Sequence, residues 1–122
     1  MDIKALSATL ILLAVGAVNL LPGLIALLPD RMVVLYGIGV DGAPMALLMR
    51  HRAVLLACVG LGLGVAAFVH ALRPAALAFA AMSKLSFLAL YLMTPGLTDE
   101  LRRVAAVDVV ALVLLAIAAL LG

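Results

Sequence analysis

The stretch Ala53-Val-Leu-Leu-Ala-Cys-Val-Gly-Leu-Gly-Leu-Gly-Val-Ala-Ala-Phe-Val69 decides the fold of this chain, because it contains no charged residue and no proline. Runs of this kind are typical of helices that cross a lipid bilayer, whose hydrocarbon core is about 30 Å thick. A helix that is apolar on every side must otherwise be buried in the core of a large protein. The residues around this run decide between the two cases.

The composition of the whole chain favours the bilayer. Of the 122 residues, 69% are hydrophobic and 11% are charged, whereas soluble domains contain about 25% charged residues. A soluble fold of this length would expose a large apolar surface to water, which is unfavourable. We therefore expect residues 1–122 to form one all-α domain of a polytopic membrane protein.

Four spans with short connections account for nearly the whole chain, because prolines such as Pro74 and Pro95 mark the breaks between apolar runs. The expected spans are residues 5–28, 44–73, 74–93 and 99–121, with the longest connection at 30–43. Short connections favour neighbouring helices that run in opposite directions. The predicted architecture is an antiparallel bundle of four transmembrane helices.

Polar side chains in all four predicted spans lie at a similar depth. Lys84 precedes the end of the third span, and Asp108 follows the start of the fourth, by similar numbers of residues. A helix rises about 1.5 Å per residue, which places both side chains about 13 Å from the same side of the bundle. The predicted polar layer consists of Asn19, Arg50, His51, Arg52, Lys84 and Asp108, with Glu100 nearer the surface.

This layer has two interpretations. Lys84 and Asp108 are expected to form an ion pair between adjacent helices, and Arg52 could reach the same carboxylate. The resulting excess of cations suits an anionic ligand or headgroup. In the alternative, the pair only fixes the helix register, and Arg50 and Arg52 extend to water. The convergence of four helices favours a functional pocket, since fixing a register needs only two.

Other reactive side chains give weaker signals. His51 is a candidate for proton transfer, because imidazole titrates near neutral pH. His70 is expected beside Arg73 at the opposite surface, and Cys58 is expected to be a small packed residue. Two distant histidines and one cysteine form no recognisable metal site. No set of nucleophile, base and orienting group can be assembled, so we expect a binding protein without a metal or cofactor rather than an enzyme.

Gly60 and Gly64 form a Gly-xxx-Gly spacing, which allows two helices to approach closely. The expected neighbour is another helix of the same chain, and the alternative is a homo-oligomer or another membrane protein. The formal net charge is only +2, without a basic stripe, so nucleic acid is not an expected partner.

Four segments carry a resemblance to a known group of proteins: Leu35-Tyr36-Gly37, Met49-Arg50-His51-Arg52-Ala53, Lys84-Leu85-Ser86-Phe87 and Leu101-Arg102-Arg103-Val104-Ala105-Ala106-Val107-Asp108. They resemble small four-span bacterial membrane proteins with a DoxX-like layout. The resemblance implies a multi-pass protein of the bacterial inner membrane. It also implies that the recurrent polar positions are Arg50, His51, Arg52 and Asp108.

Some members of that group are labelled phosphopantetheine adenylyltransferase. That enzyme is soluble and has a His-x-Gly-His-type signature, which neither Arg50-His51-Arg52 nor Val69-His70-Ala71 fits. We therefore do not expect this activity here.

The leading hypothesis is a membrane protein that binds a small or lipidic ligand at the polar layer, where the cations suit an anion. One alternative is an accessory or assembly subunit of a membrane complex, with its contact surface at Gly60 and Gly64. Another is a proton- or ion-coupled transporter that works as an oligomer through Lys84, Asp108 and His51.

Overall fold

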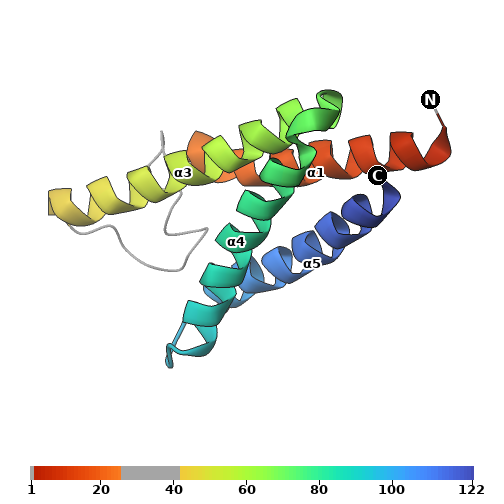
Figure 1. Ribbon diagram of the computed structural model, residues 1–122. Coiled ribbons are helices and arrows are strands. Elements are labelled where there is room, and N and C mark those ends of the chain that lie inside the picture. The colour runs from red at the N-terminus through yellow and green to blue at the C-terminus, as the bar shows by residue number, and fades with distance from the viewer. Residues whose placement is uncertain (1, 26–41) are drawn as a thin grey trace.

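The computed structural model describes residues 2–25 and 42–122. These residues form the helices α1 (Ile3–Ile25), α3 (Gly42–Phe68), α4 (Arg73–Leu92) and α5 (Asp99–Leu121), and the short 3-10 helix η1 (His70–Leu72) (Figure 1). The two described ranges contain no strand, so the predicted all-α class is confirmed there. Each of the four long helices is long and apolar enough to cross a membrane.

The second predicted span is too long, because the helix ends at Phe68 and not at Arg73. Val69 has an extended backbone, with φ −116° and ψ 94°, and η1 then turns the chain. Arg73 is consequently the first residue of α4, and Pro74 lies in the first turn, where a missing backbone donor costs little. The fourth span agrees with α5. The predicted connection at 30–43 lies outside the described residues except for its end, because α3 begins at Gly42.

The helices are arranged as two pairs. α1 packs chiefly against α3, and the two run in opposite directions in Figure 1, while α4 packs against α3 and α5. α5 also packs against α1, which joins the pairs. α3 and α4 meet at η1 and diverge from there like the arms of a V (Figure 1). We call the end at η1 the closed end, and the end with the start of α3 and the 93–98 turn the open end.

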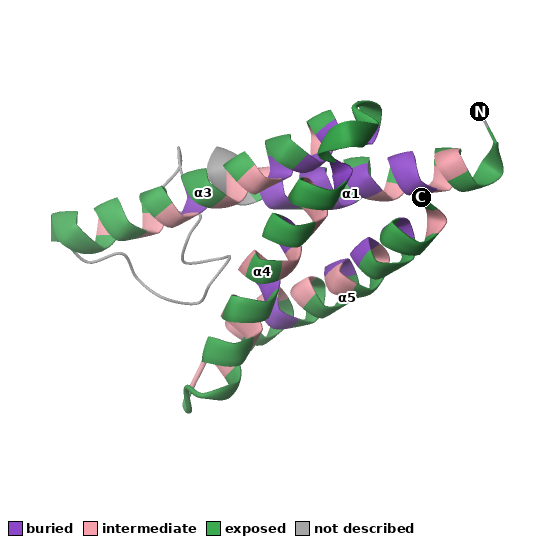
Figure 2. Cartoon of the chain, in the orientation of Figure 1, coloured by how far each residue is buried: buried purple, intermediate pink, exposed green. Residues whose placement is uncertain are grey.

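The core of the protein consists of small and branched apolar side chains. The buried cluster contains Leu12, Val15, Leu63, Ala67, Ala80, Ala111 and Leu115. In Figure 2 the buried residues of α1 and α3 gather along the faces on which these helices meet. Because all four long helices contribute to this cluster, it connects the two pairs.

The contact between α1 and α3 is a contact of backbones. A Cβ atom on Gly60 would lie 2.6 Å from the carbonyl oxygen of Gly16, and a Cβ atom on Gly16 would lie 2.9 Å from that of Gly60. Only glycine permits this approach. The expectation that Gly60 packs within its own chain is therefore confirmed. A Cβ atom on Gly64 would meet nothing within 4 Å.

The outer surface is strongly apolar. Large side chains such as Phe68, Leu92 and Leu120 are 73%, 82% and 88% exposed. Apolar surface on this scale is unfavourable in water and suits lipid.

Candidate binding site

Lys84 is the centre of a buried polar group in which three helices meet. Its side chain is only 2% exposed, and Nζ lies 3.2 Å from Oδ1 of Asp108 on α5. Nζ also donates a hydrogen bond of 2.9 Å to Oδ1 of Asn19 on α1. The ion pair expected from the sequence is therefore present, and Asn19 supplies a second acceptor to the ammonium group.

The connection between α4 and α5 fixes the register of this pair. Gly96 has φ +75°, a conformation that side chains disfavour, and it turns the chain tightly. The hydroxyl of Thr98 then accepts a hydrogen bond of 3.2 Å from the backbone nitrogen of Leu101, which caps α5. A fixed turn and a fixed helix start place Lys84 and Asp108 opposite each other.

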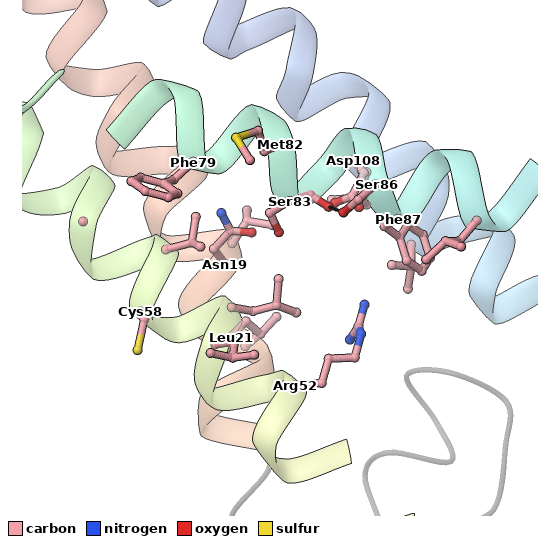
Figure 3. A pocket seen from close by; sticks show the side chains of 18 of the residues that line it. Asn19, Leu21, Arg52, Cys58, Phe79, Met82, Ser83, Ser86, Phe87 and Asp108 are labelled. Carbon is pink, nitrogen blue, oxygen red and sulfur yellow. Dashed lines mark hydrogen bonds between the residues drawn. The ribbon is translucent and has the colours of Figure 1, made fainter. Parts of the chain in front are cut away.

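A cavity of about 1160 Å³ opens beside this group. Asn19 and Asp108 line it, whereas Lys84 does not. All four long helices contribute to its wall, and in Figure 3 Arg52 and Asp108 face each other across it. The polar and charged residues of the wall are Asn19, His51, Arg52, Ser83, Ser86, Glu100, Arg103 and Asp108. The other lining residues are apolar or small, so the cavity as a whole is apolar with a polar part.

The polarity changes along the cavity. Arg52 lies in the first half of α3 and Arg103 near the start of α5, both toward the open end. Gly62 and Phe79 lie nearer η1, where the lining carries no charge. The part of the cavity toward the open end thus carries charged residues, and we call it the mouth. Polar uncharged groups and Asp108 lie in the middle, and the apolar part toward η1 is called the floor.

The structure brings most of the predicted polar layer to this one cavity. The cavity is lined by five of the predicted residues: Asn19, His51, Arg52, Glu100 and Asp108. Lys84 does not line it but binds Asn19 and Asp108. Arg50 does not line it and is exposed, because neighbouring helical residues point about 100° apart.

One further detail differs from the expectations. Cys58 is exposed and lines the cavity, so its interpretation as a packed residue is wrong. Outside the cavity, Asp99 lies 3.9 Å from Arg102, with both side chains exposed. The guanidinium carbon of Arg52 lies 5.5 Å from the centre of the Phe87 ring, a favourable cation–π distance.

Sequence reasoning missed a second buried cation, Arg73, which was expected at the surface with His70. His70 is exposed, but Arg73 is only 5% exposed. Its Nε donates 3.0 Å to the carbonyl oxygen of Ala66, and its Nη2 donates 2.9 Å to that of Ala67 and 3.1 Å to the hydroxyl of Thr9. The guanidinium group thus binds free carbonyls at the end of α3, where the helix dipole favours a cation.

One signal in the sequence could have indicated this site. In the first span, Thr9 is the only hydroxyl residue in positions 8–19. Arg73 is the only charged residue in positions 53–83. A hydroxyl and a cation at the same end of two spans suggest a contact.

No family model matches the chain, and no curated protein or solved structure is significantly similar to it. The resemblance to DoxX-like proteins thus stays an expectation.

Proposed function

We propose that this protein crosses a cellular membrane with four helices in an antiparallel bundle and binds an anionic amphiphile in the cavity of the open end. Four long apolar helices and an exposed apolar surface support the membrane location. The observation that carries the ligand proposal is a large cavity with an apolar floor and two arginines at its mouth.

The size and lining of the cavity suit a molecule with a chain. Ligand pockets commonly have volumes of about 300–1,000 Å³ and few polar groups, and this cavity, at about 1160 Å³, exceeds that range. Residues toward η1, such as Val59 and Phe79, offer only apolar contacts. An alkyl chain would remove these surfaces from contact with any polar medium.

The charges at the mouth favour an anionic head. Asp108 is compensated by Lys84 at 3.2 Å, so the pair adds no net charge to the cavity. The other charged residues of the described part of the wall are two arginines, Arg52 and Arg103, and one carboxylate, Glu100. Arginine binds phosphate and carboxylate oxygens in a bidentate geometry.

Two pairs of arginines that lie close together in the sequence allow a matched test. Arg52 and Arg103 line the cavity, whereas their neighbours Arg50 and Arg102 do not. The protein is reconstituted in nanodiscs of zwitterionic lipid, and binding of radiolabelled 1-oleoyl-glycerol 3-phosphate is compared with binding of the zwitterionic oleoyl lysophosphatidylcholine.

We expect preferential binding of the anionic probe, and binding about tenfold weaker or more in Arg52→Gln and Arg103→Gln, the effect of losing a charged hydrogen bond. Arg50→Gln and Arg102→Gln remove the same charge and should bind the probe as the wild type does. Equal losses within each pair, or unchanged binding in all four folded variants, would show that the cavity is not the binding site.

A further inference from the structure

The cavity is open along one side, between α3 and α4. These helices meet at η1 and diverge toward the open end (Figure 1), and each contributes one face to the cavity wall. The large apolar residues of these two faces that are more than half exposed are Leu48, Leu55, Phe79, Met82 and Leu90. In an enclosed cavity, the opposite wall would cover such side chains. Their exposure therefore shows that the space between α3 and α4 is accessible from outside.

This opening lies midway along both helices. Leu55 is the central residue of α3, and Met82 lies at the centre of α4. If both helices cross a bilayer, as proposed above, their centres lie in its hydrocarbon core and not at the water surface. The apolar faces on both sides of the opening are then in contact with acyl chains, since water finds no polar partners at these side chains.

A lipid or an apolar helix of another protein would fit this opening, and the charges favour a lipid. Arg52 and Arg103 lie on the cavity wall toward the open end. The guanidinium carbon of Arg52 lies 5.5 Å from the centre of the Phe87 ring, so this charge lies at an aromatic part of the wall. An apolar helix offers no anion to these arginines. An anionic phospholipid places its phosphate beside them and its chains along the apolar faces.

We infer that the ligand is an anionic phospholipid with two acyl chains, which enters the cavity sideways from the surrounding bilayer, between α3 and α4. Because the cavity is open on this side, the second chain does not have to fit inside it and extends into the bilayer. This inference rests on the proposed function, since it specifies the class and the source of the ligand of the same cavity.

The sequence contains no tryptophan, so a single introduced tryptophan reports on its own surroundings. Leu55 and Val54 are consecutive residues of α3 with the same exposed fraction, 52%, but only Leu55 lines the cavity. Leu55→Trp therefore places the reporter at the opening, and Val54→Trp places it at nearly the same depth outside the cavity. Both variants are reconstituted in vesicles of phosphatidylcholine with a minor fraction of phosphatidic acid. In one set the phosphatidic acid carries brominated chains, which quench tryptophan, and in the other an equal amount of the phosphatidylcholine carries them.

We expect brominated phosphatidic acid to quench Leu55→Trp more strongly, with a binding constant relative to phosphatidylcholine of about ten or more, the effect of one charged hydrogen bond. Val54→Trp should be quenched equally by both lipids, because it contacts the bulk bilayer. Adding Arg52→Gln and Arg103→Gln to Leu55→Trp should abolish the preference. Phe79→Trp, an exchange of aromatic residues in the opposite wall, is a second reporter that should show the same preference if Leu55→Trp does not fold.

The outcomes separate this inference from the proposed function. Equal quenching of the cavity reporters by both lipids overturns the inference, and so does quenching by neither, which would show that protein covers the opening. The same preference at Val54→Trp would show a general enrichment of anionic lipid around the protein and would overturn it too. If the single-chain probe 1-oleoyl-glycerol 3-phosphate still binds in these cases, the proposed function stands. If that probe does not bind either, the proposed function fails as well.

Discussion

The closed and the open end of the molecule each bury one cation, and they do so by different means. At the closed end, Arg73 binds two backbone carbonyls at the end of α3 and the hydroxyl of Thr9. Toward the open end, Lys84 binds the carboxylate of Asp108 and the amide of Asn19. Arg73 lies away from the cavity, whereas the partners of Lys84 line it.

The difference teaches which contacts serve the fold and which serve the site. The guanidinium fork of Arg73 ties α4 to the end of α3 and to α1. Each cluster has one buried nitrogen without a hydrogen-bond partner among the described residues, Nη1 of Arg73 and Nδ2 of Asn19. Arg73 fixes a joint between helices away from the cavity, whereas Lys84 holds two residues of the cavity wall, Asn19 and Asp108.

The largest effect is expected when Lys84 is removed. Lys84→Met leaves Asp108 without its cation, and breaking a partly buried pair in this way costs about 3–5 kcal/mol of unfolding free energy. The free energy is measured by titration with sodium dodecyl sulfate in mixed micelles. In the double variant Lys84→Met/Asp108→Leu no charge is left uncompensated, so most of the loss should be recovered. A double variant as unstable as the single one would contradict the view that charge compensation sets this cost.

A smaller loss is expected at Arg73. Arg73→Leu removes the three hydrogen bonds, which should cost about 2–3 kcal/mol, as for charged hydrogen bonds. No carboxylate is left uncompensated, and Thr9 can still bond to the carbonyl of Ala5, which limits the loss. The same titration measures it. Binding of the anionic probe should stay unchanged in the folded protein. Weaker binding would show that Arg73 at the closed end also contributes to the binding site.

The smallest of these effects concerns the glycine contact between α1 and α3. Gly60→Ala places a methyl group against the backbone of Gly16, and such overpacking costs about 1–3 kcal/mol. Gly64→Ala is the matched control, because its methyl group meets nothing. It should be neutral or slightly stabilising, since alanine favours a helix over glycine. If both variants lose the same stability, close backbone packing is not what Gly60 provides.

The sequence predicts the parts of this structure that depend on counting along helices. The four long helices follow from the apolar runs, and the Lys84–Asp108 pair follows from the distances of both residues to one short turn. The place of Arg73 could not be predicted in this way, because it depends on where α3 ends. The sequence is apolar through Val69, and nothing in it reveals the extended backbone at Val69 that exposes the carbonyls of Ala66 and Ala67.

The direction of side chains around a helix is the other feature that the sequence does not predict. Arg50, His51 and Arg52 share one depth, but the sequence does not show which of them turns outward. Their directions depend on the rotation of α3, and this rotation is fixed by the contact between Gly16 and Gly60. Gly16 was not singled out, since its partner is remote along the chain.

The pairing of Lys84 with Asp108 also bears on how the protein is made. The two residues lie on consecutive helices that are joined by a short turn, so the hairpin α4–α5 contains both the charge and its compensation. A lone lysine or aspartate at the centre of a span makes insertion by the translocon unfavourable. In the proposed membrane location, α4 and α5 would therefore enter the bilayer together during biosynthesis, with the charges of Lys84 and Asp108 compensating each other.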